Sequence, residues 1–403
     1  MKIAIFTDIL LDTWGGIPSS IRAQKKGLEK AGHEVMVFCP GFHQPKDDKI
    51  IVVPTRRWLK PDGAPLACRP AVVMKFIEAK YPELKDFDII HVHYEAAVSI
   101  VGVKLARKYR IPLVQTMHGR EDQALAQNIP RGLQFLVGCM LNFLHKHYLE
   151  GDLVVKKDNS LAPTRGRAKM WSLMVRQANQ ADIVLTPSVH FAKKLKQYGV
   201  KPEIQTVSNG IDDAIVQKEW PVRELVPGEK LRLIWNSRVS KEKRILPFLE
   251  AVKECRDFVE LSVYGGGNEL KKAQNFVKKE NLETKVKFYG PLPQAELFEK
   301  MRGQHLSVMA SYQFDTQGMT LLEAEATGLP VFFCDPDMRE VVPDYILSKD
   351  ETSVAMATAL RELFQNPKRV REMSEKMLAQ RMEVSQSVQL EKLLAIYKRL
   401  QRQ

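Results

Sequence analysis

Short apolar segments alternate with helical segments along the whole chain of 403 residues, and this alternation constrains the fold more than any other feature. The segments of strand length lie at 2–8, 33–40, 50–54, 88–95, 111–118, 181–188, 231–236, 259–267, 285–290, 305–311 and 330–335. Strands that alternate with helices form parallel sheets covered by helices on both faces. The sequence therefore predicts an α/β protein with two doubly wound domains, which suits a chain of this length.

The turn sequence VSNGID at 207–212 separates the two series of strands. It predicts an N-terminal domain at 1–206 and a C-terminal domain at 207–385. The tail from Thr352 has the apolar spacing of amphipathic helices. Its end, at about 386–403, is expected either to pack back on the N-terminal domain or to bind a partner.

The cysteines and the N-terminus bear on the compartment. The five cysteines are scattered and have no CxxC spacing, which argues against a zinc site or a disulfide framework and favours a reducing cytoplasm. Met1-Lys2 leads directly into the first apolar segment, so no signal peptide is predicted.

The net charge of +13 is unevenly distributed. Residues 1–210 hold 31 basic and 19 acidic residues, whereas residues 211–403 hold 30 and 29. A basic first half indicates an anionic partner: a membrane surface, a nucleic acid or an acidic substrate. Nucleic acid has the least support, because no zinc-finger, RNP or basic-zipper pattern occurs.

An apolar segment at 133–144 is too short to span a bilayer and has basic residues on both sides. Such a segment fits an amphipathic helix lying in a membrane interface. The alternative is a core helix followed by a solvated basic loop. Residues 56–75 add a second basic-aromatic stretch. The candidate acceptor and membrane residues are Arg131, Lys146, Arg165, Arg167, Lys169 and Trp171.

The first strand is followed by the glycine pair Gly15-Gly16 and a helix, without a GxGxxG fingerprint. The pair either lets the backbone approach a ligand or forms a tight turn that binds nothing. In parallel sheets, ligands bind at the carboxyl ends of strands, where His93, Glu95 and His118 are expected. Most lone histidines are structural. Among these candidates, His118 is favoured as the functional residue because a polar loop follows it directly.

The stretch from Phe314 to Val331 carries two acidic residues, Asp315 and Glu323, eight positions apart. A Gly-Met-Thr turn at 318–320 opens a helix whose free amides fit an anion. Glu323 then lies about one and a half turns into the helix, within reach of a ribose. The alternative is a capped surface helix with two solvated carboxylates.

Several motifs, taken in order, resemble glycosyltransferase family 4. They are Gly15-Gly16, His118, Asn209–Asp212 at the hinge, Arg238-x4-Lys243 in the donor loop, Gly265-Gly266-Gly267, and Asp315-x7-Glu323 in place of Glu-x7-Glu. The resemblance covers nearly the whole chain. Two positions depart from it: Asp315 shortens the first carboxylate by one methylene, and Arg244 stands where many relatives have glycine.

The resemblance implies a GT-B fold, with two Rossmann-like domains facing across a cleft, and a retaining hexosyltransferase. A UDP-hexose donor and catalysis without cofactor or metal are also implied, because cationic side chains and a helix start would neutralise the leaving diphosphate. The implied catalytic residues are His118, Arg238, Lys243 and Asp315. The implied donor-binding residues are Gly16, Arg238, Lys243, Gly265, Gly318, Met319, Thr320 and Glu323.

The basic-aromatic segments and the sequence RVSKEK at 238–243 resemble the branch that glucosylates diacylglycerol. This implies a lipid acceptor, an anionic membrane surface as partner, and a cytoplasmic enzyme peripheral to the inner face of the cell membrane. Two alternatives remain. One is a family 4 enzyme with a soluble or polymer acceptor, in polysaccharide or teichoic acid synthesis; the other is a non-catalytic protein that binds sugar nucleotides. The oligomeric state stays open.

Overall fold

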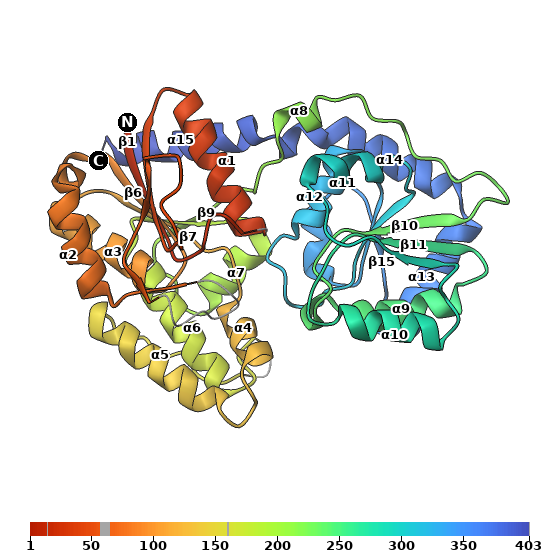
Figure 1. Cartoon of the computed structure of the whole chain (residues 1–403), viewed down its shortest axis with the longest axis horizontal. Helices are drawn as coiled ribbons and strands as arrows, with labels where there is room; N and C mark the ends of the chain where they lie inside the picture. The colour runs from red at the N-terminus through yellow and green to blue at the C-terminus, as the bar shows by residue number, and fades with distance from the viewer. Residues whose placement is uncertain (14, 57–64, 159–160, 403) are drawn as a thin grey trace. The chain divides into compact units, whose positions relative to one another are not determined.

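The computed structural model describes residues 1–13, 15–56, 65–158 and 161–402 (Figure 1). The chain divides into two compact units. The N-terminal unit holds Met1–Ser208 and Gln389–Gln403, and the C-terminal unit holds Asn209–Val388. These bounds lie within a few residues of the domain limits expected from the sequence.

Seven parallel strands form the sheet of the N-terminal unit, in the order β3-β2-β1-β6-β7-β8-β9. In its register, Ile3 pairs with Val35 on one side and Ile89 on the other. Five of the six residues of β1 are buried, as expected where helices cover both faces of a sheet. The strands are β1 (Lys2–Thr7), β2 (Glu34–Cys39), β3 (Ile50–Val52), β6 (Ile89–His93), β7 (Leu113–Thr116), β8 (Ile183–Thr186) and β9 (Glu203–Thr206).

Helices and one short hairpin complete this unit. The helices are α1 (Gly16–Lys30), α2 (Pro70–Lys80), α3 (Ala97–Tyr109), α4 (Glu121–Asn128), α5 (Gln134–Tyr148), α6 (Arg165–Ala178) and α7 (Val189–Gln197), with a 3-10 turn η2 (Pro82–Asp86). The hairpin pairs β4 (Thr55–Arg56) with β5 (Leu66–Ala67). The basic-aromatic stretch at 56–75 falls partly outside the described residues, which resume at residue 65.

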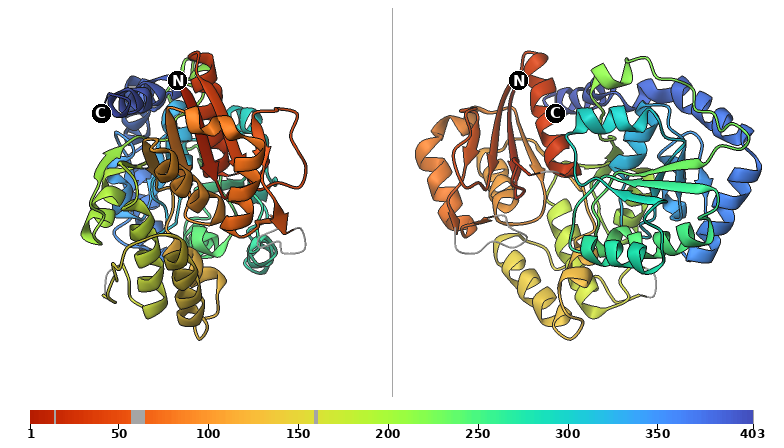
Figure 2. Two further views of the ribbon diagram at one scale, coloured as in Figure 1. Left: turned by 90° about the vertical axis from the view of Figure 1, so that its left-hand side faces the viewer. Right: turned by 45° about the vertical axis from the view of Figure 1, so that its right-hand side comes forward.

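Two glycines allow α5 and α6 to pack closely. A Cβ at Gly138 would lie 2.9 Å from the carbonyl oxygen of Gly166, and a Cβ at Gly166 would lie 2.7 Å from that of Gln134. The guanidinium of Arg176 on α6 also donates to Asn142 on α5, at 2.8 Å. The views agree that α5 and α6 (yellow to yellow-green) lie at the end of the N-terminal unit remote from α15 (Gln386–Leu400; Figures 1 and 2).

Six parallel strands form the sheet of the C-terminal unit, in the order β12-β11-β10-β13-β14-β15. They are β10 (Leu231–Trp235), β11 (Val259–Val263), β12 (Val286–Phe288), β13 (Leu306–Met309), β14 (Val331–Phe333) and β15 (Ile346–Leu347). The helices are α8 (Asp213–Val216), η3 (Lys241–Lys243), α9 (Ile245–Glu254), α10 (Leu270–Lys279), α11 (Gln294–Met301), α12 (Met319–Ala326), η4 (Pro336–Glu340), α13 (Ser353–Gln365), α14 (Lys368–Gln380) and η5 (Arg381–Val384).

The final helix, α15, packs on the N-terminal sheet. Leu393, Ile396 and Tyr397 are buried in one cluster with Ile3 and Ile5 of β1. Of the two expectations for the end of the chain, the described contacts show packing on its own chain.

Three features are not expected from the sequence: β9, β15 and the β4–β5 hairpin. β9 reads EIQT and none of its residues is buried, so it lacks the apolar run of the inner strands. β15 and the hairpin strands have only two residues each, too few for a period to show.

Candidate donor and acceptor sites

The helix α12 begins as its sequence predicts, directly after a glycine. Gly318 has φ = 77°, and a Cβ there would lie 2.7 Å from the sulfur of Met309. A side chain is therefore excluded by both conformation and space. The first turn of α12 presents Met319 and Thr320, and the Thr320 hydroxyl lies 3.5 Å from the carbonyl oxygen of Asn236. Backbone amides at this helix start suit an anion.

Glu323, on the second turn of α12, is held by two amide side chains. Asn236, just after β10, donates to Oε2 at 2.8 Å, and Gln294, at the start of α11, donates to Oε1 at 3.1 Å. Burial raises the pKa of the Glu323 carboxyl to about 7, although both hydrogen bonds act to lower it. The surface-helix alternative does not apply to this carboxylate, because Glu323 is buried.

Asp315 forms an ion pair with Lys243. The Lys243 ammonium lies 2.6 Å from Asp315 Oδ1 and 5.5 Å from the centre of the Phe314 ring, and the Ser311 hydroxyl donates to Asp315 Oδ2. The structure thus brings together two residues 72 positions apart that the sequence singled out separately. Arg238 lies at the start of the same basic loop as Lys243.

Arg238 is more open than Lys243. Its side chain is 67% exposed and pairs with Glu242 at 2.9 Å, whereas Lys243 is 14% exposed. Both cations come from the loop between β10 and α9. An anion near this loop therefore meets an exposed guanidinium and an ammonium that is held by Asp315.

The glycine run after β11 lets this basic loop pass close to the strand end. A Cβ at Gly265 would lie 2.1 Å from the carbonyl oxygen of Ser237, and one at Gly267 would lie 2.3 Å from that of Val239. Gly266 has no such neighbour, since its nearest atom is Pro291 Cδ at 3.9 Å. Gly265 therefore acts by shaping the loop that carries Arg238.

In the N-terminal unit, three histidines lie together: His91 in the middle of β6, His93 at its carboxyl end, and His118 just after β7. His93 Nδ1 is 2.8 Å from His118 Nε2, and the two rings stack with centroids 5.1 Å apart. The rings of His91 and His93 are 3.9 Å apart. Behind them, His91 bonds to the Tyr397 hydroxyl on α15 and to Thr116 on β7, both at 2.6 Å.

These imidazoles are neutral near pH 7. Burial lowers the pKa of His118 to about 4 and that of His91 to about 3, and it lowers the pKa of His93 well below the ordinary value. His118 therefore meets a ligand as a neutral hydrogen-bonding group. Gly16, the other expected donor contact from this unit, is the first residue of α1.

The candidate acceptor residues separate into exposed and internal groups. Arg131, Lys146 and Arg165 are exposed, and Lys169 is partly buried. Trp171 is fully buried and donates to the carbonyl oxygen of Leu161. The structure therefore corrects the expectation that Trp171 faces a membrane, because its ring fills the core.

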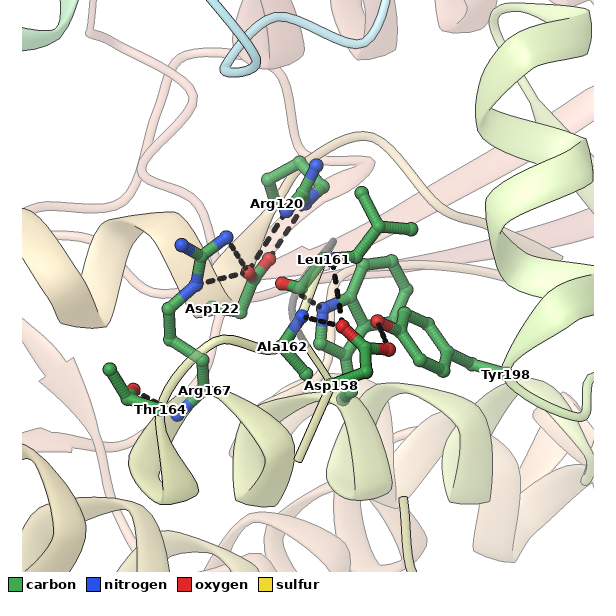
Figure 3. Close-up of polar contacts among 9 residues, drawn as sticks. Arg120, Asp122, Asp158, Leu161, Ala162, Thr164, Arg167 and Tyr198 are labelled. Atoms are coloured by element: carbon green, nitrogen blue, oxygen red, sulfur yellow. Dashed lines mark hydrogen bonds and ion pairs between the residues drawn. The ribbon is translucent and has the colours of Figure 1, made fainter. Parts of the chain in front are cut away.

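Arg167 also has an internal partner. Its guanidinium lies 2.7 Å from the buried carboxylate of Asp122, which Arg120 contacts at 2.7 Å from the other side (Figure 3). Nearby, Asp158 accepts from two backbone amides and from the Tyr198 hydroxyl (Figure 3). These contacts fix the start of α6, so Arg167 is better described as structural than as a membrane contact.

The helix α5 exposes a row of large apolar side chains. Along one stripe, Leu136 is 62% exposed, Met140 54% and Phe143 72%, and Leu133, Phe135 and Leu144 are also exposed. Contiguous exposed apolar surface of this kind marks an interaction site. The core-helix alternative accounts only for the opposite stripe, which packs on α6.

No helix among the described residues is long and apolar enough to cross a membrane. The described side chains also contain no group of three or more His, Cys, Asp or Glu residues arranged to hold a metal ion.

Sequence reasoning missed the residues that hold the candidate groups in place. They are Asn236 and Gln294 for Glu323, and Ser311 for Asp315. The sequence did place His93 at a strand end, but it did not identify His93 as the partner of His118.

Comparison with known proteins agrees with this architecture. Alpha-monoglucosyldiacylglycerol synthase of Streptococcus pneumoniae is 28% identical over 353 residues, covering 82% of this chain and 70% of the relative. The enzyme of the same name from Acholeplasma laidlawii is 24% identical over 347 residues, covering 82% and 79%.

Solved structures resemble the whole chain. Sucrose-phosphate synthase from Thermosynechococcus elongatus has a TM-score of 0.70 at 16% identity, covering 99% of this chain and 98% of its own. Anabaena HepE in complex with UDP-glucose has a TM-score of 0.66 at 16% identity, covering 98% and 100%.

Two family profiles account for nearly all of the chain. Glycosyltransferase Family 4 matches residues 14–215, and Glycosyl transferases group 1 matches residues 216–379. Because the first match spans half of the sequence and the second continues it, the chain belongs to glycosyltransferase family 4 and is an enzyme built from the two α/β domains of the GT-B fold.

Proposed function

We propose that this enzyme transfers a hexose, with retention and without a metal, from a UDP-sugar to the hydroxyl of a membrane lipid such as diacylglycerol. The observation that carries the lipid acceptor is the exposed apolar stripe of α5. Two relatives named alpha-monoglucosyldiacylglycerol synthase, and the UDP-glucose bound to HepE, support the choice of acceptor and donor.

In this proposal, α5 lies in the membrane interface. Its apolar stripe would enter the acyl boundary while Arg131 and Lys146, near its two ends, meet anionic headgroups. The contact would make the protein peripheral on the cytoplasmic face of the cell membrane. The close packing of Gly138 on Gly166 would keep α5 rigid against the rest of the unit.

In the C-terminal unit, the cations and the start of α12 would take the diphosphate. Lys243, Arg238 and the amides at 318–320 would neutralise the charge that grows on the leaving group. Glu323, fixed by Asn236 and Gln294, would accept hydrogen bonds from ribose hydroxyls. Asp315 would contact the sugar. In the N-terminal unit, His118 would act as a neutral hydrogen-bonding group for a substrate.

The first experiment measures the reaction. UDP-[14C]glucose is incubated with 1,2-dioleoylglycerol in phosphatidylglycerol vesicles, with and without EDTA. We expect a radioactive glucolipid in both samples, with an α-linkage by NMR. Glucose released only to water, or transferred only to a soluble acceptor, would overturn the lipid assignment.

The second experiment measures the membrane contact. We expect wild type to sediment with phosphatidylglycerol vesicles at low salt and Phe143→Glu to sediment poorly. Val354→Glu on α13 is the matched control, because Val354 is also 72% exposed. Equal sedimentation of the two variants would remove α5 as the membrane contact.

A further inference from the structure

The backbone at the end of β6 is strained at Tyr94. Tyr94 has φ = 138°, in a region that residues with a side chain rarely adopt. Its carbonyl oxygen accepts from Gln115 at 3.2 Å and from Gln177 at 2.5 Å, which hold this conformation. Strained backbone conformations of this kind are concentrated at functional sites, so this one suggests a functional role.

The next residue, Glu95, is largely buried. Glu95 is 7% exposed, and no described residue hydrogen-bonds to it. At the end of β6, two residues before Glu95, His93 Nε2 is buried without a partner among the described residues. Burying polar atoms without partners is costly, so a ligand is the natural complement.

The other acidic groups beside Glu95 are already satisfied. Asp8, after β1, accepts from the backbone amides of Ala96, Val98 and Ser99 at 2.7 to 3.2 Å. Glu121, at the start of α4, accepts from the Tyr94 hydroxyl at 2.7 Å. Glu95 is therefore the member of the group whose carboxyl group accepts no hydrogen bond from a described residue.

Glu95 and Glu121 also influence each other. Burial first, and then the neighbouring carboxylates, raise the pKa of Glu95 well above its ordinary value. Burial raises the pKa of Glu121 to about 7. Carboxyl groups that are desolvated close to one another resist ionising together, because each charge opposes the other. Such a pair suits a neutral hydroxyl, which donates one hydrogen bond and adds no charge.

We propose that Glu95, supported by Glu121 and Tyr94, binds the reacting hydroxyl of the acceptor in the N-terminal unit. This assignment rests on the proposed lipid glycosylation and gives its acceptor hydroxyl a specific contact. His118 follows the neighbouring strand, and a Cβ at Gly119 would lie 3.4 Å from Glu121 Oε1. The loop after β7 therefore passes beside the same carboxyl pair.

Initial rates with UDP-glucose and 1,2-dioleoylglycerol in phosphatidylglycerol vesicles test the assignment. We expect Glu95→Gln to raise the acceptor KM or lower kcat by at least about tenfold, as for the loss of one hydrogen bond. The KM for UDP-glucose should stay within about twofold. Glu95→Asp keeps the carboxylate and should recover part of the loss. Glu34→Gln, on the exposed end of β2, is the matched control.

The outcomes separate the two proposals. Glucolipid synthesis by wild type with unchanged acceptor kinetics in Glu95→Gln would overturn the role of Glu95. No glucolipid from wild type would overturn the lipid acceptor itself, and with it the ligand assigned to Glu95. If Glu95→Gln unfolds at a lower temperature than the assay, Glu95→Asp decides: a rise in the acceptor KM alone supports the role of Glu95, and wild-type kinetics or an equal rise in both substrates' KM values opposes it.

Discussion

Lys243 is held by its contacts with Asp315 and Phe314, so the ammonium is positioned before any donor arrives. Preorganised charge of this kind stabilises a leaving group without a reorganisation cost at the moment of reaction. The sequence located both charges through their motifs. It could not locate Asn236 and Gln294, because amide side chains from separate strands and helices meet Glu323 only in the folded chain.

Lys243→Ala should lower kcat/KM for the nucleotide sugar by about 10- to 100-fold, since a hydrogen bond to a charged group is worth about 1.5–3 kcal/mol. Lys241→Ala is the control, because Lys241 is an exposed lysine in the same 3-10 turn. Steady-state kinetics measure both. Equal losses in the two variants would mean that the loop contributes only its overall charge.

Glu325 predicts a pH dependence of stability. Burial, and then the charge of Glu383, raise the pKa of Glu325 to about 8. A raised carboxyl pKa in the folded state means that its contribution to stability is complete below about pH 4.5 and is lost as the pH rises towards 8. The substitution Glu325→Gln should therefore destabilise the protein less at pH 8 than at pH 5, and at pH 8 it could even stabilise the protein.

Urea unfolding at pH 5 and pH 8 measures this difference. We expect the free energy of unfolding of Glu325→Gln, relative to wild type, to improve by at least about 1 kcal/mol between the two pH values, since one pKa unit corresponds to about 1.4 kcal/mol. Glu362→Gln, at an exposed position of α13, should show no such change. A parallel pH profile for Glu325→Gln and wild type would contradict the prediction.

At the scale of elements, the inner strands and most helices follow from apolar periodicity, because a buried parallel strand reads as an unbroken apolar run. β1 and β10 are examples, since both were expected within a few residues of their observed ends. The polar edge strand β9 lacks that signal. The outward orientation of the apolar stripe on α5 was one of two alternatives, since composition does not reveal which stripe of a helix meets α6.

The β11–α10 connection gives a prediction at this scale. Gly265→Ala would place a Cβ 2.1 Å from the Ser237 carbonyl oxygen, so the basic loop must shift. We expect the variant to lose about 1–3 kcal/mol of stability and to bind UDP more weakly. Thermal unfolding with and without UDP measures both effects. Gly266→Ala, with its nearest atom 3.9 Å away, is the control. Similar behaviour of the two would show that the glycines are interchangeable.

At the scale of the whole molecule, the N-terminal unit is built from both ends of the chain. Tyr397 is fully buried and bonds to His91, so α15 belongs to the same core as the histidines at the ends of β6 and β7. Sequence alone left the partner of this helix open, because an amphipathic stripe does not identify the surface that covers it.

Tyr397→Ala should destabilise the protein by about 3–5 kcal/mol, the usual cost of removing a buried aromatic ring. Lys392→Ala, on the exposed face of the same helix, should change stability by less than about 0.5 kcal/mol. Chemical denaturation of both variants measures the difference. A cost below about 1 kcal/mol for Tyr397→Ala would show that α15 is only loosely attached.

The return of α15 to the first sheet has a consequence for synthesis on the ribosome. Strand β1 is synthesised early. The residues Leu393, Ile396 and Tyr397, which pack against it, are synthesised only after the whole C-terminal unit has been translated. Nascent chains therefore carry an uncovered apolar surface on the N-terminal sheet for most of elongation. The C-terminal unit is one continuous segment. All of its residues are therefore synthesised before the N-terminal unit is complete.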